Sequence, residues 1–140
     1  MTISKKCLSE RIIAFESAVR AGQLKMTDQR RAVYRAVAAV ETHPTAEAVW
    51  RAVRRRQPDV SFATVYRNLG QLRDLGLILE LRPKDGQVRF DANCGTHGHL
   101  VNLKTGAIRD VPLIGRPPRP RGIRTADIRH TVVIFYVAGE

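Results

Sequence analysis

Hydrophobic residues recur at helical spacing in four segments of the first half of the chain. Intervals of three and four residues place such side chains on one face of a helix. In the first segment they are Leu8, Ile12, Phe15 and Val19. Each of the next three segments follows a hydroxyl residue, Thr27, Thr45 or Ser61, that can cap a helix N terminus. The pattern therefore predicts four helices, the last of which stops at Gly76.

After Gly76 the pattern changes to the alternation that is typical of a strand. One face of this strand is predicted to carry Leu77, Leu79 and Leu81, and the other Ile78, Glu80 and Arg82. Asp85-Gly86 is a favoured hairpin turn, and Val88 and Phe90 alternate on the return strand. Helices followed by a two-stranded hairpin predict a winged-helix domain over residues 1–90, which is a helix-turn-helix with a β wing.

Residues 91–140 predict a second, smaller domain. Its candidate short strands are Leu100–Leu103 and Ala107–Leu113, whereas the prolines of Arg116–Arg121 exclude a helix or a central strand. Thr131–Ala138 is almost entirely β-branched and aromatic, which predicts a strand covered on both faces. So short a domain has little core of its own, so we expect a homodimer. The predicted fold class is α+β, with an N-terminal winged helix and a small C-terminal α/β dimerisation domain.

The charge of the chain indicates a polyanionic partner. There are 24 Lys and Arg against 13 Asp and Glu, a formal net charge of +11. Nucleic acid is the commonest partner of so basic a small protein. No apolar run is long enough to span a membrane and the first ten residues are polar, so we expect a cytoplasmic protein without a secretory signal or membrane partner. Two cysteines exclude a disulfide framework.

The fourth predicted helix presents polar residues opposite its apolar stripe. Their types hydrogen-bond base edges and phosphates, and they are Thr64, Arg67, Asn68 and Gln71. Tyr66 lies beside them and could contact a thymine methyl group. An ordinary solvated helix face is the alternative, but the preceding helix and the following wing favour DNA recognition. The candidate phosphate or minor-groove contacts are Lys25, Arg30, Arg31 and Arg35.

Two of the four histidines, His97 and His99, are separated by one glycine. Alternate residues of an extended chain point the same way, so both imidazoles can face one ion. Asp91 precedes them and Asp110 follows, and imidazole with carboxylate suits Fe(II), Mn(II) or Zn(II). A pair of surface histidines is the alternative. Cys94 fits no standard zinc spacing, which favours a small buried residue or an idle thiol over a ligand.

These residues together resemble the ferric uptake regulator family of metal-dependent repressors. The matching segments are LKMTDQR (24–30), HPTAEAVW (43–50), ATVYRNL (63–69), LGLI (75–78), VRFD (88–91) and HGHL (97–100). The resemblance implies a winged helix, a dimerisation domain and one regulatory metal at the hinge between them. It places the metal ligands at His43, Asp91, His97, His99 and Asp110. It also implies DNA contacts by Tyr66, Arg67 and Lys25.

The acidic ligands favour one branch of that family. Iron-sensing members often carry Glu where this chain has Asp91 and Asp110, and the peroxide-responsive branch (PerR) is similar to this chain in using Asp. The hypothesis is therefore a repressor that senses peroxide through iron-catalysed oxidation of a ligand histidine, His97 or His43. The alternative is an iron- or manganese-responsive repressor of metal uptake genes. The expected ion is Fe(II) or Mn(II), which Zn(II) could replace in purified protein.

The chain departs from the family in three places. Asn102 and Thr105 stand at the first cysteine pair of the family's structural zinc site, and no second pair follows Ala138. No four-cysteine zinc site is therefore expected. A further metal site of some members lacks its other ligands here, so His130 is predicted to be a core histidine. Residues 111–128 are proline-rich where the family usually has a helix, which predicts a reduced dimerisation domain.

Two rival functions come from other classes. Two histidines and a carboxylate can hold catalytic Fe(II), but no acid, base or oxyanion-stabilising residue accompanies them, so we expect no enzyme. A winged helix can also bind an acidic protein through its basic face. The expected partner is instead a palindromic double-stranded DNA operator, whose binding should weaken steeply with salt.

Overall fold

The computed structural model describes residues 3–84, 86–93, 95–128 and 131–139. The chain divides into two compact units, Met1–Cys94 and Gly95–Glu140. Asp85, Cys94 and His130, which the sequence predictions involve, lie outside the described residues. In the described part of the chain, every helix is too short or too polar to cross a membrane.

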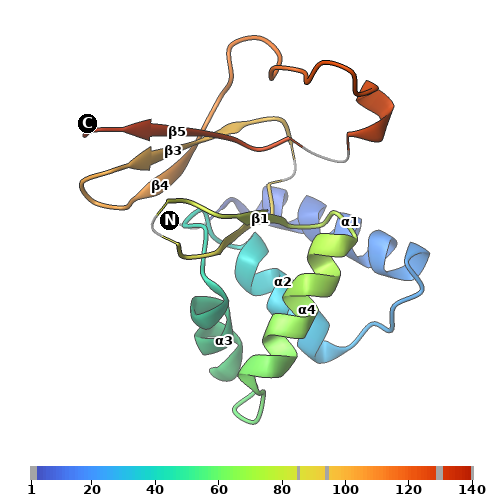
Figure 1. Ribbon diagram of the computed structural model, residues 1–140. Coiled ribbons are helices and arrows are strands. Elements are labelled where there is room, and N and C mark those ends of the chain that lie inside the picture. Colours follow the sequence, from blue (N-terminus) through green and yellow to red (C-terminus); the bar gives the residue numbers. More distant parts are fainter. Residues whose placement is uncertain (1–2, 85, 94, 129–130, 140) are drawn as a thin grey trace. The chain divides into compact units, whose positions relative to one another are not determined.

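The described residues of the first unit form four helices, as the apolar spacing predicted. They are α1 (Lys5–Ala21), α2 (Asp28–Ala38), α3 (Ala46–Arg54) and α4 (Phe62–Asp74) (Figure 1). The hydroxyl groups of Thr27, Thr45 and Ser61 each accept a hydrogen bond from the backbone N–H three residues later. These bonds satisfy amides that the first helical turn leaves without partners. The three predicted N-caps are therefore confirmed.

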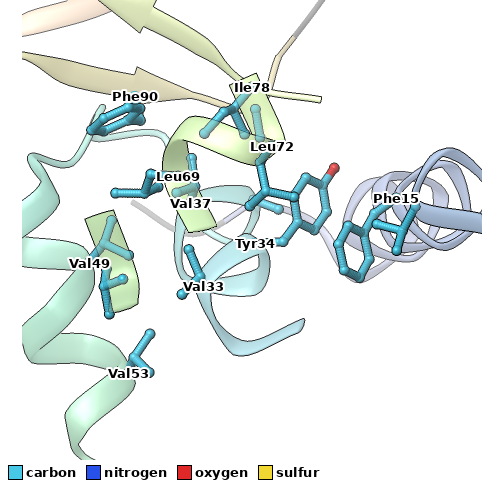
Figure 2. Packing of buried hydrophobic residues seen from close by; sticks show 14 of the residues in the cluster. Phe15, Val33, Tyr34, Val37, Val49, Val53, Leu69, Leu72, Ile78 and Phe90 are labelled. Atoms are coloured by element: carbon cyan, nitrogen blue, oxygen red, sulfur yellow. The ribbon is translucent and has the colours of Figure 1, made fainter. Parts of the chain in front are cut away.

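The core of the first unit lies around α2, which packs against the other three helices. Its buried side chains converge between the helices and include Phe90 from the wing (Figure 2). Phe15 of α1 stacks on Tyr34 of α2, with ring centroids 4.5 Å apart. Burial of each large side chain contributes about 1.5–3 kcal/mol, so this core holds α3 and α4 against α2.

The wing is a short antiparallel hairpin of β1 (Leu79–Leu81) and β2 (Arg89–Asp91). The hairpin is confirmed, but its first strand begins two residues later than the alternation predicted. Ile78, predicted on the same face as Glu80 and Arg82, is instead buried in the helical core. The reason is that residues 75–78 form the turn that leaves α4, so the pleat of the strand does not yet apply to them.

The second unit is a three-stranded sheet of β3 (Gly98–Asn102), β4 (Ile108–Val111) and β5 (Val133–Val137). The strand order is β4-β3-β5, with β4 antiparallel and β5 parallel to the central β3. A long connection joins β4 to β5, and its described residues include the 3-10 turn η1 (Thr125–Asp127) (Figure 1). Arg116–Arg121 lies in neither helix nor strand, as its prolines predicted. The chain is thus α+β, with a winged helix followed by a small sheet-based unit.

Candidate metal and DNA-binding residues

Three of the predicted metal ligands come together within the second unit. His99 lies on β3 directly opposite Asp110 on β4, so the strand register itself pairs them. The Nε2 atoms of His97 and His99 are 3.1 Å apart. The Asp110 Oδ1 atom lies 3.4 Å from Nε2 of His97 and 3.5 Å from Nε2 of His99. The expectation that the two imidazoles point the same way is confirmed.

These separations fit a shared metal ion. Ligands held at about 2.0–2.2 Å from one ion lie roughly 2.8–3.6 Å from each other at angles of about 90–110°. The Nδ1 atom of His97 is 2.7 Å from the Gly95 carbonyl oxygen. Because a carbonyl only accepts hydrogen bonds, Nδ1 is the donor in this contact, which leaves Nε2 of a neutral imidazole as the ring atom that can bind a metal ion. The donor set and its geometry therefore suit Fe(II), Mn(II) or Zn(II).

Gly98, between the two histidines, allows close packing on the opposite face of β3. A Cβ atom at this position would lie 2.8 Å from Cδ2 of Leu113 and 3.0 Å from Cε2 of Phe135. Real Cβ atoms are essentially never as close as the first of these distances. A side chain here would push Leu113 and β5 away from β3, and glycine is therefore the residue that lets this packing coexist with the histidine pair.

The other two predicted ligands, His43 and Asp91, meet within the first unit. The loop before α3 is attached to β2, because the Phe90 N–H donates to the Pro44 carbonyl and Thr45 pairs with Arg89. This attachment places Nε2 of His43 3.6 Å from Oδ2 of Asp91. His43 has a φ of +52°, an uncommon left-handed conformation for a residue other than glycine. The backbone amide of Asn93 donates to the other Asp91 oxygen at 2.8 Å.

Asn102 and Thr105 hold the turn between β3 and β4 by hydrogen bonds. Oδ1 of Asn102 accepts from the backbone amides of Lys104 and Thr105, at 2.8 and 3.2 Å. Oγ1 of Thr105 accepts from the amide of Ala107, and Gly106 adopts the left-handed φ of +73°. Where the resemblance places a cysteine pair, this chain therefore closes the turn with side-chain caps.

The α4 helix presents part of the predicted DNA-contact set to solvent. Tyr66 is 57% exposed and Arg67 and Lys25 are also exposed, while Thr64 is half-buried. Phe62 is 43% exposed, although its position relative to Val65 and Leu69 follows the apolar spacing of the helix, and it packs beside Tyr66 with ring centroids 6.1 Å apart. At the first position of the helix its side chain projects beyond the core. The exposed surface of α4 is thus more aromatic than its sequence pattern predicted.

Two of the predicted DNA contacts, Asn68 and Arg30, are buried. Asn68 is only 4% exposed and donates to the Thr64 carbonyl within α4, so its predicted exposure is wrong. Arg30 is 8% exposed and donates to the Lys25 carbonyl and, at 2.5 Å, to Oε1 of Gln71. It connects the loop that carries Lys25 to α4. Neither side chain is available for DNA, and both serve the packing of the helices beneath the exposed residues.

A sequence model of the ferric uptake regulator family matches residues 21–114, two thirds of the chain. The chain belongs to the ferric uptake regulator family. The match includes all five candidate metal ligands and the whole of α2, α3 and α4. It ends before the connection between β4 and β5 reaches its proline-rich part.

The relatives of this chain are named for different signals. The peroxide-responsive repressor PerR of Staphylococcus epidermidis is 35% identical over 94 residues, which are 67% of this chain and 63% of that protein. A zinc-bound manganese uptake regulator of known structure is 28% identical, with a TM-score of 0.62 over 87% of this chain and 97% of that one. The Helicobacter pylori ferric uptake regulator Fur, 18% identical, matches 99% of this chain and 95% of its own with a TM-score of 0.69 and shows the fold alone.

Proposed function

We propose that this chain is a metal-dependent, DNA-binding transcriptional repressor. The observation that carries the proposal is the convergence of His97, His99 and Asp110 in a chain whose helix-turn-helix exposes Tyr66 and Arg67. Membership of the regulator family supports it. The matched segment spans less than two thirds of the length of the PerR relatives, so their activity is carried to this chain as a proposal only.

One Fe(II) or Mn(II) ion is proposed to bind His43, Asp91, His97, His99 and Asp110. The second unit offers three ligand atoms and the first unit two, and neither set alone completes the five ligands of the proposal. When bound, the ion supplies a positive charge that attracts both sets of ligands. Because that binding energy is gained only when the two sets meet, it shifts the population of the protein towards one arrangement of its units. That arrangement is proposed to be the one that binds DNA.

The signal is proposed to be peroxide. Two aspartates complete the ligand set, and PerR proteins of staphylococci are among the relatives at 35% identity. Fe(II), when bound, supplies a one-electron reductant for peroxide next to the imidazoles. In the net change one peroxide oxygen enters an imidazole C–H bond of His97 or His43 and the other leaves as water. The alternative is a manganese- or iron-responsive regulator, which the similarity to a manganese uptake regulator favours.

Alanine in place of Tyr66 or Arg67 should weaken operator binding without unfolding the chain, since both side chains are exposed and the buried face of α4 stays intact. Loss of one good base contact costs about 1–3 kcal/mol, roughly a 5- to 150-fold change in Kd. The measurement is fluorescence anisotropy with the manganese-loaded protein and a duplex that wild-type protein selects from a random pool. Arg20→Ala, an exposed arginine on α1, is the matched control. Equal effects of Arg67→Ala and the control would show that α4 does not contact the DNA.

The chain is also proposed to form a symmetric homodimer through its second unit. β5 is an edge strand of the sheet, and Phe135 on it is 46% exposed. Apolar edges of this kind are normally covered, and a two-fold axis matches a palindromic operator. Phe135→Asp should therefore give monomers in light scattering at micromolar concentration, whereas Phe62→Asp, at a phenylalanine of similar exposure on α4, should leave the dimer intact. A monomeric wild-type protein would contradict the proposal.

A further inference from the structure

The connection between β4 and β5 contains a basic segment that the family match does not cover. This Arg–Pro segment, residues 116–124, has the sequence RPPRPRGIR and follows the last matched residue, 114. Gly115 and Gly122 adopt left-handed φ values of +77° and +80°, and the chain bends at the first and turns at the second, on either side of the run from 116 to 121. Prolines at 117, 118 and 120 fix the backbone between them in an extended form.

Three arginines of this segment present unneutralised charge to solvent. Arg116, Arg119 and Arg121 are exposed, and the part of the chain that the structure describes offers none of them an ion pair. Arg124 differs, because it donates two hydrogen bonds, of 2.9 and 3.0 Å, to Asp127. Residues 95–140 hold seven Lys and Arg against three Asp and Glu, a net charge of +4, and four of the seven basic residues are the arginines of this segment.

We propose that the Arg–Pro segment is a second DNA-binding element, which enters an A·T-rich minor groove beside the site that α4 reads. This inference rests on the proposed function, since it requires a DNA-binding protein. The prolines hold the arginines apart and lower the conformational entropy that is lost on binding. From Arg116 to Arg121 the extended chain covers about 15 Å, or roughly four to five base pairs.

The shape and charge of the segment select the minor groove. The groove is about 6 Å wide and admits an extended chain, whereas the major groove takes a helix or a β-ribbon. Narrow A·T tracts concentrate negative potential and attract inserted arginines, as extended arms of other DNA-binding proteins do. An anionic membrane is less suitable, because Ile114 and Ile123, the exposed apolar residues at either end of the run, are not part of a helix that could place them on one face opposite the arginines.

The test compares full-length, manganese-loaded wild-type protein with a variant that carries Arg116→Gln, Arg119→Gln and Arg121→Gln. The probes are the selected operator with flanks of A·T, G·C or inosine·C pairs. Inosine·C presents the A·T minor groove, which lacks the guanine amino group, but the major groove of G·C. Wild-type protein should bind the A·T and inosine·C probes at least about five-fold more tightly than the G·C probe, and the variant should bind all three equally. The dependence of log Kd on the logarithm of the salt concentration should have a slope smaller by about two to three per subunit in the variant.

A control variant with Lys5→Gln, Arg20→Gln and Lys104→Gln removes the same charge from exposed positions elsewhere and should keep the flank preference. If the segment variant matches this control, the inference is wrong while the proposed function stands. A loss of affinity that is equal on all flanks also overturns it, because only phosphates are then contacted. The inference is likewise overturned if the segment variant keeps its DNA binding but no longer binds phosphatidylglycerol vesicles. If wild-type protein binds no duplex with or without metal, the proposed function itself has failed.

Discussion

Substitution of Asp110 or His43 is expected to abolish metal-dependent operator binding. Asp110 lies beside the two imidazoles of the second unit, and His43 beside Asp91 in the first. Removal even of a residue that only supports a metal ligand lowers metal affinity about 10- to 100-fold, so loss of a ligand should cost roughly 100-fold or more. If one ion is shared, a substitution in either unit should have the same effect, which calorimetry with Mn(II) and operator anisotropy would both record.

The two variants are Asp110→Ala and His43→Asn. Asparagine is chosen because it tolerates the left-handed backbone of residue 43, so the substitution tests the imidazole and not the turn. Arg109→Ala, the neighbour of Asp110 on β4, is the control, since adjacent strand residues point to opposite faces. If His43→Asn leaves manganese affinity unchanged while Asp110→Ala destroys it, the ion belongs to the second unit alone and the shared site is wrong.

Low peroxide is expected to separate the iron form from the manganese form. Fe(II) is a one-electron reductant of peroxide and Mn(II) is a poor one. Mass spectrometry should therefore find one added oxygen on a peptide that contains His97 or His43 in the iron form only. The iron form should also release the operator, because an oxidised imidazole no longer supplies its lone pair to the ion. Its affinity for the operator should fall roughly 100-fold or more, as on loss of a ligand.

Two controls make this outcome specific. The manganese form treated alongside should stay unmodified and bound to the operator. If the shorter reach of the aspartate is what leaves the ion accessible to peroxide, Asp110→Glu should still bind metal and DNA but lose its sensitivity to peroxide. An iron form that stays unmodified, and releases DNA only when iron is withdrawn, would favour the iron-responsive alternative.

Local features were predictable because short-range chemistry fixes them. The N-caps at Thr27, Thr45 and Ser61 depend only on a hydroxyl group and an amide three residues later. The shared direction of His97 and His99 follows from strand geometry alone. The proximity of Asp110 to His99 depends on the β3–β4 register, and the residues alone did not predict it. The residues alone had named Asp110 as a candidate carboxylate, and only the family resemblance supplied His43.

Two errors in the predicted DNA surface share one cause. Positions 65, 68, 69 and 72 of α4 follow helical spacing, so Asn68 lies within the apolar stripe despite its polar side chain. Positions 30, 33, 34 and 37 of α2 place Arg30 in the same way. The spacing could have identified both as buried. What the pattern could not give is the partner of Arg30, because Gln71 comes from another helix.

The topology of the sheet in the second unit could not be predicted from the sequence, for a different reason. β5 pairs in parallel with β3 across a connection of more than twenty residues, and such long-range pairing leaves no local signal. The strand character of Thr131–Ala138 was evident from its β-branched and aromatic residues, and β5 lies within it. Its partner strand and its direction in the sheet were not.

The central claim, that one metal ion enables this chain to bind DNA, is tested most directly by one titration. Mn(II) is added to metal-free protein at a micromolar concentration, at which the dimer is expected to form. Binding to the selected operator is followed by fluorescence anisotropy. Operator binding should rise in proportion to added Mn(II) and reach its plateau at one ion per subunit. Metal-free protein that binds the operator as tightly as the manganese form would contradict the account.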